Sequence, residues 1–150
     1  METGKFPSNL SSIKSYSESF QGDSCSVVLA VIDRESDCHI GNVTLNHISW
    51  IHRTADTGLM IGDKIFWGKG YAYEAWGLIL AYAFRRLGLR RITAGVAEGN
   101  EASITVLQKL GFQIEGCQRA EYWIDNRYRD RFMLGLLLDE FRSPPQFRQG

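Results

Sequence analysis

Short apolar runs separated by polar turns fill the first half of the chain after residue 25. Ser26–Asp33 (SVVLAVID) is rich in β-branched residues and predicts a strand, which ends at the turn RESDC. His39–Ile51 alternates in part and predicts a second strand with a bulge near Asn46, and Thr57–Asp63 predicts a third. Three consecutive strands with short connections indicate an antiparallel meander.

Helical spacing marks one segment before these strands and two segments after them. Ser8–Phe20 is weakly amphipathic and predicts a short helix within a partly helical N-terminal region, residues 1–25. Tyr73–Leu87 is apolar on nearly every side, so it predicts a long helix that is buried over most of its surface. Glu101–Leu110 predicts a second helix, for which Asn100 supplies the N-cap.

The remaining strands alternate with these helices. Arg90–Ala97 (RRITAGVA) predicts a strand between the two helices, and the runs FQIEGC and RFMLGLLL, which begin at Phe112 and Arg131, predict two more. Residues 143–150 (SPPQFRQG) predict a frayed tail. This order of elements predicts an α+β fold with a mixed, mostly antiparallel central sheet flanked by helices.

Length and charge narrow the class of protein. A chain of 150 residues fits one domain, residues 1–150, with a sizeable core. Its 17 basic and 17 acidic side chains give a formal net charge of zero, which argues against nucleic acid or an anionic membrane surface as a partner. No apolar run reaches the roughly 18 residues that span a bilayer, and the polar start lacks the apolar core of a signal peptide. We therefore expect a cytoplasmic protein.

Cysteine and histidine do not suggest a metal centre. The cysteines are three in number and far apart, which fits neither a disulfide framework nor a zinc site. His39, His47 and His52 fall within one region, but the elements predicted there are strands and loops. We interpret them as ordinary strand and loop histidines and expect no bound metal.

Glycines and a lysine precede the long apolar helix in the stretch IGDKIFWGKGYAYEAW, residues 61–76. A P-loop requires G-x-x-x-x-G-K-[ST], but five residues separate Gly62 from Gly68, and Gly70 stands where a hydroxyl must bind magnesium. A Rossmann fingerprint requires a third glycine where this chain has Tyr73. The stretch therefore satisfies neither nucleotide-binding pattern.

The same turn nevertheless has the chemistry of an anion site. Gly68 and Gly70 allow a tight turn with the backbone N–H groups pointing inward, and Lys69 adds a positive charge. The turn leads into a helix N-terminus, which favours a negatively charged group such as a pyrophosphate. A plain strand-to-helix turn explains these residues equally well, so the stretch alone leaves both interpretations open.

A second motif further along the chain decides between them. The turn WGKGYAYEA, from Trp67, and the motif N-x-x-S-x-x-V-L-x-K-L-G-F, from Asn100, together resemble the Gcn5-related N-acetyltransferases (GNAT). The resemblance covers roughly Val27–Leu138 and is greatest to the branch that contains the RimJ and RimL ribosomal-protein acetyltransferases. It implies one acetyltransferase-like domain that takes acetyl-coenzyme A as its co-substrate and acetylates a primary amine of a small molecule, an aminosugar or a protein N-terminus.

For the coenzyme, the resemblance implies a site made by the glycine turn and the strand before it. The pyrophosphate would lie on the turn, the pantetheine arm would pair with the strand MIG, and the thioester would enter a splay between that strand and TAGVA. Trp67 stands where many relatives have Arg or Gln. The coenzyme-binding residues implied in this way are Met60, Ile61, Gly62, Trp67, Gly68, Lys69, Gly70, Tyr71, Ala72, Asn100 and Ser103.

Acetyl transfer to an amine needs a proton acceptor and donors for the oxyanion, and it can use an acid for the leaving thiolate. Leu107 replaces the tyrosine that many relatives use as that acid, and the resemblance implies Ser103 in its place. The stretch EGCQRAEYW resembles the RimL-like sequence and implies Glu121 as a candidate base. A solvated loop carboxylate explains Glu121 as well, and catalysis by positioning, with a water relaying the proton, is a further alternative.

The start of the chain departs from the family pattern, which opens with a strand and a helix. Residues 5–20 resemble the second helical region, so the first strand and helix are expected to be missing. A truncated chain, an open sheet edge, or a strand borrowed within a homodimer would each explain this. Besides the N-acetyltransferase we therefore keep three alternatives: a truncated, weakly active enzyme, a non-catalytic coenzyme-binding module, and a structural or interaction domain.

Overall fold

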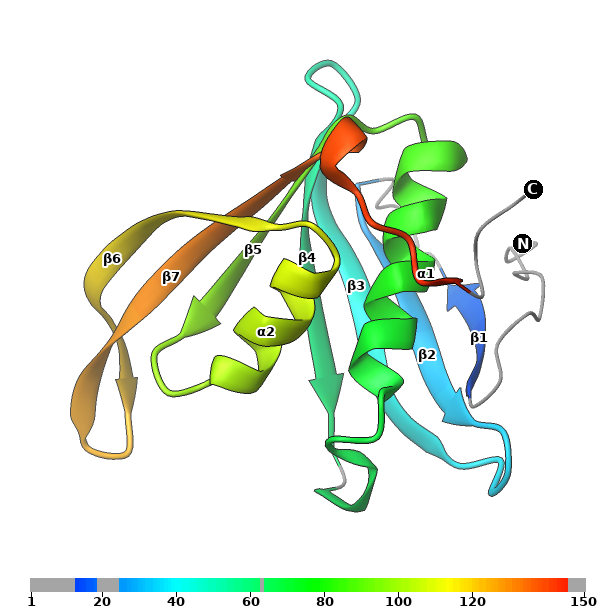
Figure 1. Ribbon diagram of the computed structural model, residues 1–150, viewed down its shortest axis with the longest axis horizontal. Coiled ribbons are helices and arrows are strands. Elements are labelled where there is room, and N and C mark those ends of the chain that lie inside the picture. The colour runs from blue at the N-terminus through cyan, green and yellow to red at the C-terminus, as the bar shows by residue number, and fades with distance from the viewer. Residues whose placement is uncertain (1–12, 19–24, 63, 146–150) are drawn as a thin grey trace.

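The computed structural model describes residues 13–18, 25–62 and 64–145. Seven strands form one sheet in the order β1-β2-β3-β4-β5-β7-β6 (Figure 1). Every neighbouring pair is antiparallel except β4 and β5, which are parallel, so the predicted α+β fold with a mostly antiparallel sheet is confirmed. The bounds of the strands are β1 Ile13–Glu18, β2 Val27–Asp33, β3 His39–Ser49, β4 Thr54–Ile61, β5 Arg91–Ala97, β6 Gln113–Ile124 and β7 Arg127–Leu137.

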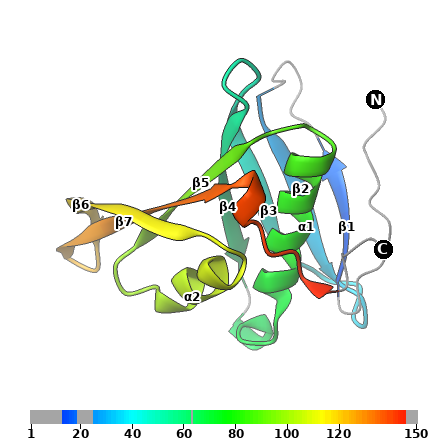
Figure 2. The same cartoon turned by 45° about the horizontal axis from the view of Figure 1, so that its top comes forward.

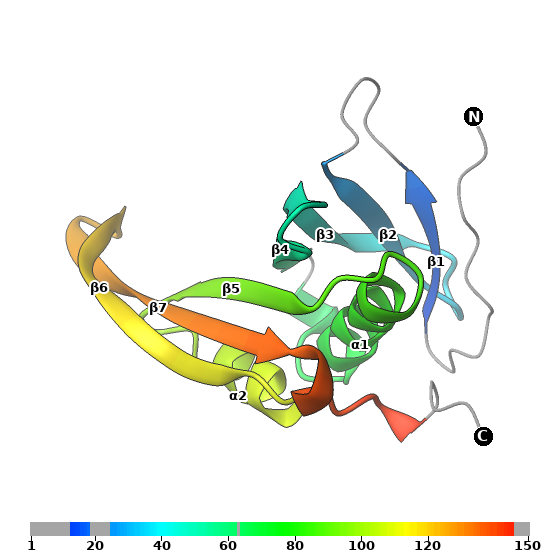
Figure 3. The same ribbon diagram turned by 90° about the horizontal axis from the view of Figure 1, so that it is seen from above.

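Two α-helices lie over one face of this sheet, α1 (Tyr71–Arg85) and α2 (Glu101–Lys109), and Figures 1, 2 and 3 agree on this arrangement. Short 3-10 turns, η1 (Lys64–Phe66) and η2 (Leu138–Glu140), precede α1 and follow β7. In the described part of the chain the opposite face carries no helix. We call the face that carries no helix in the described residues the open face.

The core lies between α1 and the alternate residues of the strands that face it. Eleven of the fifteen residues of α1 are buried, as its apolar pattern predicts. Leu45 in β3, Ile92 in β5 and Leu136 in β7 are fully buried against the helical layer. Because strand residues alternate between faces, their immediate neighbours in sequence lie on the open face.

The parallel pair β4 and β5 is short. Their register covers three residue pairs, Thr54–Asp56 with Arg91–Thr93, although both strands continue further. Beyond these pairs the two strands diverge, as Figure 1 shows. The splay that the family resemblance implied between these strands is therefore present.

The N-terminal helix predicted for Ser8–Phe20 is wrong where the structure describes it. Ile13–Glu18 is strand β1, which pairs antiparallel with β2 over six residues. The helical pattern there was weak, and a backbone ladder along β2 satisfies the N–H and C=O groups of this segment instead. β1 covers the edge of β2 that we considered open, while residues 8–12 and 19–20 of the predicted helix lie outside the described residues.

The C-terminal elements differ from prediction in length. β6 continues seven residues beyond the predicted FQIEGC run, and β7 begins four residues before the predicted RFMLGLLL run. The two strands form a long hairpin that projects from the body (Figure 3). Ser143 and Pro144 are buried, and Phe141 packs on Phe84 with ring centroids 5.3 Å apart. The first two residues of the tail expected to fray from residue 143 are thus buried, and residues 146–150 lie outside the described part. Neither described helix is both long and apolar enough to cross a membrane.

Candidate coenzyme site and acceptor face

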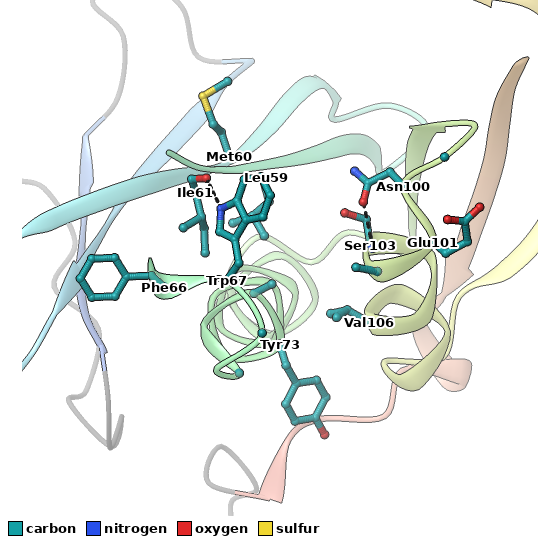
Figure 4. Close-up of a pocket in the computed structure, with 15 residues that line it drawn as sticks. Leu59, Met60, Ile61, Phe66, Trp67, Tyr73, Asn100, Glu101, Ser103 and Val106 are labelled. Carbon is teal, nitrogen blue, oxygen red and sulfur yellow. Dashed lines mark hydrogen bonds between the residues drawn. The ribbon is translucent and has the colours of Figure 1, made fainter. Parts of the chain in front are cut away.

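A cavity of about 650 Å³ lies on the helical side of the splay, between the end of β4, the turn before α1 and the start of α2 (Figure 4). Eight of the coenzyme-binding residues predicted from sequence line it. The lining residues are Leu59, Met60, Ile61, Phe66, Trp67, Gly68, Gly70, Ala72, Tyr73, Gly99, Asn100, Glu101, Ala102, Ser103 and Val106.

The glycine turn has the conformation that an inward-facing backbone requires. Gly68 and Gly70 have φ values of 74° and 87°, in the left-handed region that favours glycine. Gly70 is the N-cap of α1 and has no side chain to bond the first-turn N–H groups, which a helix leaves without internal partners. Ala72 and Tyr73, in that first turn, line the cavity. The turn therefore presents unsatisfied amides and a helix N-terminus to an anion.

The side chain of Tyr71 does not line the cavity. It is buried, and its hydroxyl donates a 2.6 Å hydrogen bond to Asp33 Oδ1 at the end of β2. The other oxygen of Asp33 accepts bonds from the Ser36 hydroxyl (2.6 Å) and backbone N–H (3.0 Å). These bonds lower the pKa of Asp33, Ser36 contributing most, and the bond to Asp33 raises the pKa of Tyr71 to about 12. Tyr71 thus anchors the turn through its side chain, which leaves only its backbone for the coenzyme.

The edge of β4 that faces the splay carries the predicted MIG segment. Gly62 N–H donates to Ile40 O (3.0 Å), so this group is used within the sheet. Strand residues alternate in direction, so the backbone of Ile61 points away from β3. Its carbonyl accepts a 2.8 Å hydrogen bond from the Trp67 indole N–H, which crosses the cavity wall (Figure 4). Lys69 and Gly62 are the other two predicted coenzyme residues that do not line the cavity.

The predicted motif at the start of α2 forms the opposite wall. Asn100 Oδ1 accepts a 3.3 Å hydrogen bond from Ser103 N–H, so Asn100 is the N-cap of α2 as predicted. Both residues line the cavity (Figure 4). Leu107, at the position of the missing tyrosine, is fully buried in the core. The serine is therefore the hydroxyl that this helix presents to the cavity.

Glu121 lies away from this cavity. It is exposed in β6, within a register shift between Gln118 and Tyr122 in the projecting hairpin. The shift is stabilised by Ala120, which has a φ of 53° and donates its N–H to Asp130 Oδ1 (2.9 Å). The alternative to a catalytic Glu121 was a solvated loop carboxylate, and the structure places this exposed side chain in a strand of the hairpin.

Asp56, a carboxylate that the sequence did not single out, lies where β4 and β5 begin to diverge, which we call the apex of the splay. Asp56 of β4 is the last β4 residue paired with β5, and its Oδ1 accepts a hydrogen bond from the Thr93 hydroxyl. Its other oxygen lies 3.2 Å from His47 Nδ1, and its side chain is 46% exposed. The predicted third strand began at Thr57, so Asp56 fell in the preceding turn. The only signal in the sequence was a charged residue directly beside an alternating apolar run.

The site contains no arrangement that suggests a metal. In the described ranges no three His, Cys, Asp or Glu side chains lie close enough together to hold a metal ion.

Comparison with known proteins identifies the family. Residues 1–113 match the model of the acetyltransferase (GNAT) domain. The chain is 37% identical over 112 residues to the uncharacterized N-acetyltransferase p20 of Bacillus licheniformis, covering 75% of this chain and 62% of that protein. It is 33% identical over 110 residues to spermidine N(1)-acetyltransferase of Escherichia coli K12, covering 71% and 59%.

A solved structure shows the same fold. Spermidine N-acetyltransferase from Vibrio cholerae, crystallised with CoA and spermine, superposes with a TM-score of 0.73 at 30% identity, covering 79% of this chain and 69% of that one. The chain spans about three fifths of the length of the curated relatives named above. The match over residues 1–113, together with the shared fold, shows that this chain belongs to the GNAT acetyltransferase family.

Proposed function

We propose that the protein is an acetyl-coenzyme A-dependent N-acetyltransferase that acetylates a primary amine of a small molecule. The observation that carries this proposal is the position of the 650 Å³ cavity. It joins an anion-binding turn to the open edge of β4 beside a splayed strand pair. A long ligand with a pyrophosphate at one end and a thioester at the other matches that sequence of environments.

The residues present fit the coenzyme along the length of the cavity. The turn at Gly68 and Gly70 and the first-turn amides of α1 would hold the pyrophosphate, and Lys69 adds a neighbouring positive charge. The backbone of Leu59 and Ile61, which faces away from β3, would pair with the pantetheine amides. Asn100 and Ser103 would contact the coenzyme from the opposite wall.

In the proposed reaction, the neutral amine nitrogen attacks the thioester carbon from the open face of the sheet. A C–N bond forms, the C–S bond breaks and the thiolate leaves, while the ammonium formed by attack loses one proton. A free alkylamine is mostly protonated at neutral pH, so a nearby carboxylate is needed to accept a proton before attack. Asp56, at the apex of the splay and half exposed, is the best-placed carboxylate for this step.

Two further groups complete the mechanism, and one carboxylate is an alternative base. Backbone N–H groups of β4 beyond Asp56 have no partner strand on the β5 side, and they can donate to the developing oxyanion. Ser103, which lines the cavity, would protonate the thiolate. Glu121, the base implied by the resemblance, stays a second candidate whose part in catalysis would require the projecting hairpin to reach the acceptor.

From the sequence we further propose that the protein belongs to the RimJ/RimL-like branch, forms a homodimer and is cytoplasmic. A protein N-terminus is an alternative acceptor. A small amine is the favoured acceptor because several named relatives are spermidine acetyltransferases.

The test is the initial rate of coenzyme A release from acetyl-coenzyme A with and without a panel of primary amines. An N-acetyltransferase releases the thiol in proportion to acetylated amine, confirmed by mass spectrometry of the product. A non-catalytic coenzyme-binding module would bind acetyl-coenzyme A without amine-dependent release, and a structural domain would not bind it.

A further inference from the structure

The guanidinium of Arg131 occupies the space beside Gly95 where a Cβ would stand, on the open face of the sheet. A Cβ added at Gly95 would clash with Nε, Nη2 and Cζ of Arg131. Gly95 does not have a positive φ, so its backbone conformation does not require glycine. The absence of a side chain at Gly95 instead leaves room for the guanidinium.

Gly95 and the guanidinium of Arg131 lie next to the apex of the splay. Gly95 follows Thr93 by two residues in β5, so both lie on the same face, and Thr93 donates its hydroxyl to Asp56. Two residues along a strand span roughly 7 Å. A carboxylate and a guanidinium thus stand side by side on the face from which the acceptor would approach, separated by about the length of a small bifunctional molecule.

The charge of Arg131 is not compensated by any carboxylate in the described part of the chain. Its Nη1 donates to the neutral Gln118 amide oxygen at 3.3 Å, and its buried Nε has no hydrogen-bond partner. Two nearby arginines do have a carboxylate partner. Arg91 is held by both oxygens of Glu115 (2.5 and 2.8 Å), and Arg129 lies 3.6 Å from Asp125, although its own buried Nε also has no hydrogen-bond partner. Arg131 is half-buried and is the one of these three arginines without a carboxylate partner, so beside a proposed active site its charge indicates an anionic ligand group.

From these contacts, and building on the proposed function, we propose that the acceptor is a primary amine carrying an acidic group, a carboxylate or a phosphate, within a few bonds. The acidic group is held by Arg131 over Gly95, and the amine is directed to Asp56. This charge pattern disfavours a polycationic acceptor, because its second ammonium would face the guanidinium. It thereby separates this chain's acceptor from the polyamine named for several of its relatives.

The experiment compares acceptors that differ only in the acidic group: β-alanine with β-alaninamide, and O-phosphoethanolamine with ethanolamine, with spermidine alongside. We expect kcat/KM for at least one acidic member to exceed that of its neutral match by about tenfold or more, the size of one charge-assisted contact. A preference within the β-alanine pair identifies the acidic group as a carboxylate, and a preference within the O-phosphoethanolamine pair identifies it as a phosphate. Equal or higher kcat/KM for both neutral members, or a preference for spermidine, overturns the proposal.

Three variants test whether Arg131 is responsible for the preference for the acidic amine. Arg131→Gln should remove the preference, lowering the rate with the acidic amine by about tenfold while changing the neutral amine by less than about twofold. Gly95→Ala, which displaces the guanidinium without removing it, should act in the same direction. Arg127→Gln, an exposed arginine of the same strand, is the matched control and should keep the preference. If Arg131→Gln lowers both rates alike, Arg131 does not bind the acidic group.

A binding measurement tests the acidic-group site independently of the proposed acetyltransferase activity. The melting temperature of the protein saturated with coenzyme A is measured with each amine added. Stabilisation by the acidic amine alone, lost in Arg131→Gln, supports the acidic-group site even if no amine is acetylated, in which case the proposed activity fails. Equal stabilisation by acidic and neutral amines, or none by either, overturns the site.

Discussion

The hydroxyl of Tyr71 donates a 2.6 Å hydrogen bond to Asp33, although 38 residues separate them in the chain. Tyr71 is the first residue of α1, and Asp33 is the last residue of β2. The ring of Phe66, which lines the cavity, packs edge-on against Tyr71 at 5.5 Å. This buried pair therefore fixes the helix N-terminus that we propose binds the pyrophosphate.

Removing the Tyr71 hydroxyl should destabilise the fold. Tyr71→Phe leaves the ring in place but takes one donor from a buried carboxylate, which should lower the free energy of unfolding by about 1–2 kcal/mol. Urea denaturation measures the change. Tyr128→Phe, at a tyrosine that is 63% exposed, is the control and should change stability by less than about 0.5 kcal/mol. Equal stability of the wild type and Tyr71→Phe would contradict a structural role for this bond.

The same bond predicts a loss of stability at high pH. The bond to Asp33 and burial raise the pKa of Tyr71 to about 12, above its ordinary value of 10 in the unfolded chain. A raised pKa contributes stability that is fully present below pH 10 and is lost as the pH rises through about 12. Melting temperatures between pH 9 and 12 should therefore fall more steeply in the wild type than in Tyr71→Phe. Parallel curves would exclude this contribution.

Two glycines with similar backbones allow the turn to be tested with a matched control. Gly70 and Gly88 have φ values of 87° and 70°, and a Cβ at either would meet no other atom within 4 Å. Alanine at each site should thus cost about 1–2 kcal/mol of stability through backbone strain alone. Only Gly70→Ala should also weaken acetyl-coenzyme A binding, by about tenfold or more, because Gly70 shapes the cavity. Equal affinities of the two variants would argue against the turn as the pyrophosphate site.

The two candidate bases can be compared side by side. Asp56→Asn keeps an acceptor for the Thr93 hydroxyl but removes the proton acceptor, so kcat at neutral pH should fall by about a hundredfold. Acetyl-coenzyme A affinity should be nearly unchanged, since Asp56 does not line the cavity. Glu121→Gln should have a small effect on kcat if Asp56 is the base. The opposite ranking would assign the role to Glu121 and require the hairpin to move.

Local patterns predicted most of the fold but few of the contacts at the site. The bulge predicted near Asn46 coincides with a register shift between Asn46 and Ser49, and the N-cap at Asn100 is observed, because both follow from short-range rules. The short weak pattern over Ile13–Glu18 failed, because pairing with β2 outweighs a marginal helical preference.

The polar contacts of the open face arise from the register between distant strands. Asp56 contacts Thr93, 37 residues further along the chain, and Arg131 of β7 contacts Gly95 of the neighbouring strand β5, so no spacing in the sequence connects either pair. The glycine turn was found because its residues are contiguous. For Tyr71, sequence identified the segment but not the direction of the side chain, which tertiary packing decides.

Calorimetric titration of acetyl-coenzyme A into the protein tests the central claim most directly. We predict one saturable site, with a melting temperature that rises on binding, since ligand at 100 times its dissociation constant adds about 2.7 kcal/mol to stability. Gly70→Ala should weaken that binding while Gly88→Ala should not. No binding heat and no change in melting temperature would contradict the assignment of this cavity to acetyl-coenzyme A.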